Sequence, residues 1–140
     1  MYPFSVTPTY SLDVFCDDQT TVYVDGVEVY SDTNWQAKGS VTVPLTAETI
    51  TVKCLDVGGG YGIVGELKDQ DGNVVTNTDS SWSCSSDGEN WKTATINDNA
   101  VMLNNSPFNE LTSSDRKVIW SDSPNGEAFC RKNLVQVEGK

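Results

Sequence analysis

The sequence predicts an all-β protein, an antiparallel β-sandwich of the jelly-roll type that forms a single domain over residues 1–140. Short runs of β-branched and aromatic residues alternate with polar residues, which is typical of strands with one buried face. Asp-Gly pairs separate several of these runs and favour hairpin turns. No stretch has apolar residues at the 3.6-residue spacing of a helix, and 140 residues with 37% hydrophobic content are enough for one core.

The alternation places strands along most of the chain. Asp25-Gly26 is the strongest hairpin signal, and the stretch 69–72 predicts a second turn of this kind. Cys16 and Cys54 both fall on the apolar faces of their strands, so these two residues can meet inside the core. The expected strands cover residues 12–16, 20–24, 27–30, 41–45, 50–54, 63–67, 73–76, 118–120 and 128–131.

Two connections interrupt this pattern. The glycine run within 58–62 cannot be the interior of a strand without a loss of order, so we expect a loop there. The stretch 85–114 is polar and irregular. Trp91 and the apolar group 101–103 are its expected anchors on the body of the domain.

The end of the chain is expected to form a last hairpin. Strands at 118–120 and 128–131 flank a turn at 123–126 that contains Pro and Gly. Trp82 and Trp120 are assigned to the core, since both stand in alternating stretches.

The charge of the chain limits the classes of partner. With 20 Asp and Glu against 9 Lys and Arg, the formal net charge is −11. Nucleic acid is therefore not an expected partner, since phosphate binding needs a basic face. Cations and neutral ligands fit this charge better, and the alternative is that the acidity only serves solubility.

The four cysteines, at positions 16, 54, 84 and 130, predict two disulfides and hence a secreted, extracellular protein. They lack the CxxC spacing of a zinc or redox site, and the chain has no histidine to act as a zinc ligand or general base. The start, residues 1–4, lacks the basic and apolar parts of a signal peptide, so we expect a mature chain. No apolar run approaches the ~20 residues of a membrane span.

Three carboxylates form a candidate calcium site. Asp17 and Asp18 follow the first strand, and Asp56 follows the strand that contains Cys54. Calcium takes six to eight oxygen ligands, and an acidic pair at a strand end supplies some of them when a third carboxylate arrives from a neighbouring strand. The alternative is that Asp17 and Asp18 only begin a turn before Gln19, a common role for Asp.

Trp35 lies in a polar connection, which favours a surface role for its ring over the core or half-buried position that is usual for a lone tryptophan. Asn34 and Gln36 flank it, and their amides can hydrogen-bond to hydroxyl groups. A bound divalent cation accepts two vicinal hydroxyls of a sugar while an aromatic ring covers the apolar side of the sugar. These features predict a calcium-assisted sugar site in a lectin-like protein.

Catalysis is not expected. Adjacent carboxylates at a strand end cannot flank a glycosidic bond as a catalytic pair must, and no nucleophile has a base beside it. A third class stays open, namely a structural or adhesive extracellular protein in which calcium only stabilises the sandwich. Sugar binding that a chelator abolishes separates a lectin from this class.

Seven short segments, spread over nearly the whole chain, follow one another in the order of a known family. They are Asp17-Asp18, Tyr23-Val24-Asp25-Gly26, Asn34-Trp35, Gly59-Gly60-Tyr61-Gly62, Asp79-Ser80-Ser81-Trp82, Val118-Ile119-Trp120 and Phe129-Cys130-Arg131-Lys132. This ordered set resembles the galactose-binding-like jelly-roll modules attached to bacterial rhamnosidases, including the calcium-dependent rhamnose-binding carbohydrate-binding modules.

The resemblance implies that Asp17, Asp18 and Asp56 bind a calcium ion whose shell is completed by sugar hydroxyls. A loop carbonyl near Gly60 is a further implied ligand, and rhamnose is the first candidate sugar, followed by galactose and fucose. The chain departs from the family at Asp18 and Asp56, where Asn is frequent, and at Gly60, where the family has Pro. The extra charge is expected to hold the ion more tightly, and the departures leave the sugar preference open.

The resemblance implies that Trp35 lines the sugar, and the predicted sugar contacts also include Asn34 and Tyr61, beside the three aspartates. One site on a small domain gives weak affinity, so useful avidity needs several copies, as in a homo-oligomer.

The resemblance bears on the disulfides too. In the resembling sequences a Cys after Asp-Ser-Ser-Trp accompanies one before the closing Arg, which implies a bridge from Cys84 to Cys130. We expect it together with a bridge from Cys16 to Cys54, which share apolar faces beside the proposed ion site.

Overall fold

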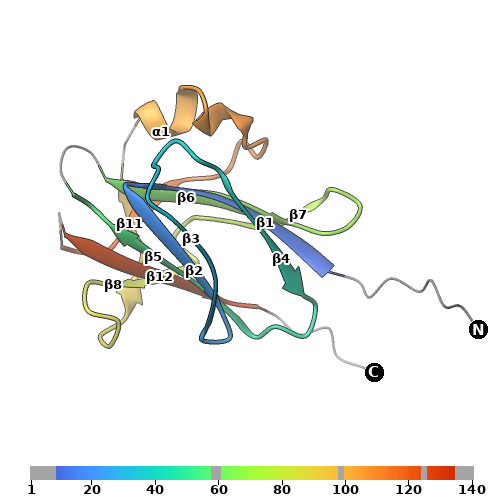
Figure 1. Ribbon diagram of the computed structural model, residues 1–140, viewed down its shortest axis with the longest axis horizontal. Coiled ribbons are helices and arrows are strands. Elements are labelled where there is room, and N and C mark those ends of the chain that lie inside the picture. The colour runs from blue at the N-terminus through green and yellow to red at the C-terminus, as the bar shows by residue number, and fades with distance from the viewer. Residues whose placement is uncertain (1–8, 58–60, 98–99, 124–125, 135–140) are drawn as a thin grey trace, which may run out of the picture.

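Two antiparallel β-sheets packed face to face make up the molecule (Figure 1). The computed structural model describes residues 9–57, 61–97, 100–123 and 126–134. Strand pairs in these residues run antiparallel. The all-β sandwich predicted from the alternation and the Asp-Gly turns is therefore confirmed.

Within the described residues, each sheet has six strands. Sheet 1 contains β1 (Thr9–Asp17), β4 (Gly39–Pro44), β6 (Gly62–Lys68), β7 (Val74–Asn77), β10 (Thr95–Asn97) and β11 (Val118–Trp120). Sheet 2 contains β2 (Gln19–Val24), β3 (Val27–Asp32), β5 (Thr49–Leu55), β8 (Ser83–Ser85), β9 (Lys92–Thr93) and β12 (Glu127–Asn133). The strand order is β10-β11-β6-β1-β4 in sheet 1, where β7 pairs with β6, and β3-β2-β5-β12-β8-β9 in sheet 2.

The core lies between the sheets, because alternate residues of a strand point to opposite faces. In β5, for example, Ile50, Val52 and Cys54 are buried while the residues between them are partly exposed. Trp82 and Trp120 are buried as well, which confirms their predicted place in the core.

Both expected disulfides are present. Cys16–Cys54 joins β1 of sheet 1 to β5 of sheet 2, and Cys84–Cys130 joins directly paired residues of β8 and β12. The bridged residues are 38 and 46 positions apart. Disulfides that close loops of this length are expected to stabilise the fold by roughly 4 kcal/mol each, because they restrict the unfolded chain. Two disulfides are compatible with an extracellular protein.

A covering segment, residues 100–116, lies over the outer face of sheet 1 (Figure 1). It contains α1 (Ala100–Asn104) and η1 (Phe108–Glu110). Val101, an expected anchor, is 51% exposed, whereas Met102 is buried. A short helix presents only one side to the sheet, so three consecutive residues cannot all be anchors. The buried residues between this segment and the sheet are Phe15, Val64, Met102, Phe108, Leu111 and Val118.

The hairpin expected between 118–120 and 128–131 is wrong. β11 pairs with β10 and β6 in sheet 1, whereas β12 pairs with β5 and β8 in sheet 2, so the chain crosses from one sheet to the other. The three residues of β11 are all buried, since the core covers one face and the covering segment the other. A strand without an exposed face shows no alternation, so its sequence does not indicate which strand lies beside it.

The glycine loop predicted within 58–62 ends before Gly62. Gly62 is the first residue of β6, paired with Asp17 of β1, rather than part of the loop. A Cβ atom at this position would collide with Val118 and lie 2.8 Å from the sulfur of Met102. Glycine is therefore required here for close packing of the covering segment.

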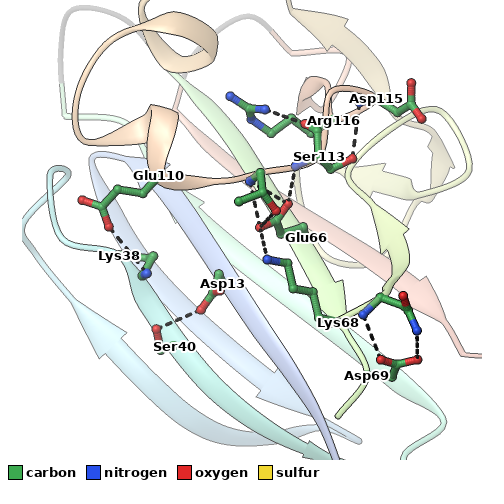
Figure 2. A network of polar contacts seen from close by, with 12 residues as sticks. Asp13, Lys38, Ser40, Glu66, Lys68, Asp69, Glu110, Ser113, Asp115 and Arg116 are labelled. Carbon is green, nitrogen blue, oxygen red and sulfur yellow. Dashed lines mark hydrogen bonds and ion pairs between the residues drawn. The ribbon is translucent and has the colours of Figure 1, made fainter. Parts of the chain in front are cut away.

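Glu66 anchors the covering segment from within sheet 1 (Figure 2). Its side chain is buried, and its carboxylate accepts hydrogen bonds from the backbone N–H groups of Thr112 (3.1 Å) and Ser113 (2.8 Å). Lys68 forms an ion pair with it at 3.3 Å. Burial raises the pKa of Glu66, but the two backbone donors and Lys68 outweigh burial, so the pKa lies below its ordinary value.

Replacing Glu66 with Gln is expected to destabilise the protein by ~1 to 3 kcal/mol at neutral pH, because the amide loses charge-assisted hydrogen bonds. Since the folded state lowers the pKa of Glu66, its stabilisation is present above the unfolded-state pKa and is lost as the pH falls through the folded-state pKa. Urea unfolding curves of wild type and variant should therefore converge in strong acid. The control is Glu110→Gln, which removes only the exposed pair with Lys38. If the difference in unfolding free energy between Glu66→Gln and wild type is the same at neutral pH and in strong acid, this role is contradicted.

Candidate functional site

One corner of the sandwich collects the predicted carboxylates. Asp17 ends β1, Asp18 stands between β1 and β2, and Asp56 follows β5. The Asp18 N–H donates to the carbonyl of Leu55 at 3.0 Å, and Asp18 Oδ2 accepts from the N–H of Val57 at 2.9 Å. These bonds tie the turn after β1 to the end of β5, so three acidic residues from distant parts of the sequence share one corner.

The local sequence explains why the corner is well held. The Cys16–Cys54 disulfide lies directly behind it, one residue before Asp17 and two before Asp56. The N–H of Asp56 donates to the carbonyl of Gly126 at 2.7 Å, which ties the start of β12 to the same corner. The peptide bond between the two adjacent aspartates is cis.

The carboxylates of Asp18 and Asp56 interact electrostatically with that of Asp17. Burial raises the pKa of Asp17, and a hydrogen bond to Asp18 and the charges of Asp18 and Asp56 raise it further, to about 7 from an ordinary 3.8. The ion pairs within the described ranges join lysines to other acids, so Asp17 and Asp18 have no cationic partner there. The pair of Asp17 and Asp18 therefore has no described cation to offset its negative charge.

The described acidic side chains do not by themselves form a complete set of ligands for a metal ion. Among the residues that the structure describes, no three His, Cys, Asp or Glu side chains lie close enough together to hold one ion. Asp17 and Asp18 are in direct contact, while Asp56 acts on Asp17 through its charge. Gly60, the residue predicted to supply a carbonyl ligand, lies outside the described residues. The corner offers two adjacent carboxylates and a third negative charge.

Trp35 lies between β3 and β4, beside the covering segment. Its ring stacks on Phe108 with centroids 5.8 Å apart, and Phe108 packs edge-on against Phe15 at 5.0 Å. Phe15 precedes Asp17 by two residues, so their side chains belong to the same outer face of β1. Trp35 is 38% exposed although one face of its ring is covered. The ring is thus supported from below and open to solvent, on the same side of sheet 1 as Asp17.

The other two predicted sugar contacts have local partners. Asn34 Oδ1 accepts from the N–H of Gln36 at 2.9 Å, and the Asn34 N–H donates to Asp32 Oδ1 at 2.8 Å. Asn34 therefore shapes the loop that presents the Trp35 ring. The ring of Tyr61 packs against Trp120 at 4.9 Å and is partly buried against the core.

The residue that supports Trp35 was missed in the sequence. Phe108 is fully buried, yet it stands in the polar stretch that the sequence marks only as irregular. The available signal is a lone aromatic residue between Pro107 and Asn109, which indicates an anchor but not what it contacts.

Comparison with protein-family models, curated proteins and solved structures finds no match for this chain. The likeness to the rhamnosidase modules therefore rests on sequence motifs and stays a prediction. In the described ranges, no helix has the length and apolar character needed to cross a membrane.

Proposed function

We propose that the protein binds sugars with the help of a calcium ion at the corner of Asp17, Asp18 and Asp56. The observation that supports this function is the position of the three aspartates at one corner, where burial, a hydrogen bond to Asp18 and the charges of Asp18 and Asp56 together raise the pKa of Asp17 to about 7. Like charges in one corner repel each other, and a divalent cation among them offsets most of that repulsion.

The donor set suits a hard cation that also takes neutral ligands. Asp17 and Asp18 would hold the ion directly, and Asp56 would add negative charge. Calcium binds six to eight oxygen atoms, so carbonyl groups, water and two vicinal hydroxyls of a sugar are needed to complete its shell. The ion, when bound, selects sugars by the relative orientation of these hydroxyls. Rhamnose is the first ligand to test, before galactose and fucose.

A ligand-binding role is favoured over a purely structural or adhesive role of calcium. The Cys16–Cys54 disulfide already joins the two strands that lead to Asp17 and Asp56, so the corner does not need an ion to stay closed. A glycan array with and without a chelator tests the proposal directly. We expect sugar binding that the chelator abolishes. A fall in melting temperature with chelator, without sugar binding at any calcium concentration, would support the structural role instead.

Trp35 is the proposed platform for the apolar side of the sugar. Replacing Trp35 with Ala is expected to weaken sugar binding by ~1 to 3 kcal/mol, by analogy with aromatic stacking on bases, and to leave calcium affinity unchanged. Trp35→Tyr keeps a ring over Phe108 and serves as the matched control, with a smaller loss. Calorimetric titration with calcium and then with sugar measures both effects. Equal sugar affinity in all three proteins would place the sugar elsewhere.

The wider assignment follows from these points. We infer a secreted binding protein without catalytic activity, since the two disulfides suit an oxidising compartment and the proposed site holds a ligand rather than flanking a bond. Weak binding at one corner makes a multivalent assembly useful, and size-exclusion chromatography measures whether copies associate.

A further inference from the structure

The outer face of sheet 2 presents a cation in unusual surroundings. Arg131 of β12 points outward, because its neighbour Cys130 points into the core. The strand register places Thr51 of β5 on one side of Arg131 and Ser83 of β8 on the other. All three outward residues are partly exposed. Arg131 is therefore flanked on this face by two residues with hydroxyl-bearing side chains.

Trp91 holds the guanidinium group in place. The central carbon of the Arg131 guanidinium lies 3.9 Å from the centroid of the Trp91 ring. Stacking of this kind uses one face of the planar group and leaves the N–H donors at its edge available. Within the part of the chain that the structure describes, the side chain of Arg131 forms no ion pair and no hydrogen bond. The charge is thus oriented but not neutralised, in a protein with a net charge of −11.

We propose that Arg131, with Thr51, Ser83 and Trp91, binds the carboxylate of a uronic acid unit in an acidic polysaccharide. The planar fork of N–H donors matches the two oxygens of a carboxylate. The flanking hydroxyls can bind the oxygens of the same sugar unit, and the ring of Trp91 offers an apolar surface to it. This site lies on the sheet opposite to Trp35 and involves no calcium.

The same face suits an extended sugar chain. Tyr23 of β2 is paired with Thr51, so it lies on the row of outward residues that contains Arg131. Two strand spacings separate Tyr23 from Arg131, roughly 10 Å. A polysaccharide that crosses the strands along this row would meet Tyr23 two strands away from the cation and the Trp91 ring in contact with the cation itself.

Charge and topology argue against two other occupants. Lys53, the next outward cation, is already paired with Glu127 at 3.3 Å, so the face has little charge for a densely sulfated chain, which the net charge of −11 would repel. A peptide that adds a strand needs a sheet edge, whereas β12 is paired on both sides by β5 and β8. A ligand with single carboxylates on a flat chain fits better.

The test uses the full chain in chelator, a glucuronate-containing oligosaccharide and its carboxyl-reduced counterpart, with binding followed by calorimetry. We expect the acidic form to bind. The reduced form should bind at least roughly tenfold more weakly, since a charge-assisted pair is lost. Arg131→Gln is expected to cause a loss of about the same size, and Arg131→Lys a smaller one, because lysine keeps the charge without the fork.

Lys132→Gln is the matched control, since it removes the same charge from the next residue of β12, which bonds to Ser81 instead. This control should bind like wild type. Three outcomes would overturn the site: equal binding of the reduced oligosaccharide, equal loss in Lys132→Gln, or tighter binding of a sulfated oligosaccharide. Because chelator is present throughout, failure here leaves the calcium corner untested, and failure of the calcium corner leaves this result unchanged. Melting curves of Arg131→Lys and wild type confirm that the variant is folded.

Discussion

Replacing Asp17 with Asn is expected to abolish calcium binding and, with it, chelator-sensitive sugar binding. The variant keeps the shape of the side chain but removes a carboxylate that lies in contact with Asp18 and in the field of Asp56. The fold should survive, since the core and both disulfides do not depend on this group. Calorimetric titration with calcium, followed by the sugar titration, measures both losses.

The same substitution is expected to change stability in the opposite sense when calcium is absent. The folded state raises the pKa of Asp17 to about 7 from 3.8, so ionisation of this group opposes folding increasingly as the pH rises between these values. The chelated Asp17→Asn variant should therefore be more stable than chelated wild type above neutral pH. The two should converge in acid below the ordinary carboxyl pKa, where both carry a neutral group. By the same competition, wild type should bind calcium more weakly as the pH falls below 7.

Asp13→Asn is the matched control for both effects. Asp13 lies four residues earlier on the same face of β1 and accepts a hydrogen bond from Ser40 at 2.9 Å, away from the acidic corner. It removes the same charge and should leave calcium affinity unchanged. If Asp17→Asn retains full calcium affinity, or if Asp13→Asn loses as much, the proposed corner is not the ion site.

Replacing Phe108 with Ala is expected to destabilise the protein by ~3 to 5 kcal/mol, since truncation of a buried aromatic residue leaves a cavity. Phe108 is fully buried between Phe15 and Trp35. The substitution removes the ring on which Trp35 stacks, so sugar affinity should fall as it does in Trp35→Ala. Calcium affinity should stay close to that of wild type, because the acidic corner lies beyond Phe15. Urea unfolding gives the stability, and the two titrations give the affinities.

Val101→Ala separates this effect from a general loosening of the covering segment. Val101 lies in the same segment but is exposed, so its truncation should change stability by less than about 0.5 kcal/mol. A Phe108→Ala protein with unchanged sugar affinity would show that the stack beneath Trp35 does not matter for binding.

The local pattern of the sequence determined most of the strands, the Asp-Gly turns and the buried faces on which Cys16 and Cys54 lie, but not the short strands β8, β9 and β10. Alternation with a period of two decides which face of a strand is buried, so Cys16 and Cys54 were expected in the core from their neighbours alone. Asp-Gly turns depend on backbone conformations that a few residue types favour, and Asp25 has the positive φ value that such a turn needs. The alternation also marks where the first strand ends, so Asp17 and Asp18 could be placed at a strand end from the sequence.

Apart from the two hairpins β2–β3 and β6–β7, only the tertiary structure decided which strands are neighbours and what each surface residue contacts. β11 and β12 lie in different sheets although they are adjacent in sequence, because pairing depends on contacts with distant strands such as β6 and β5. Glu66 beneath the covering segment, Phe108 beneath Trp35 and Trp91 over Arg131 likewise join residues from separate elements. No short-range pattern encodes such pairs, since the side chains meet only after both sheets and the covering segment have packed.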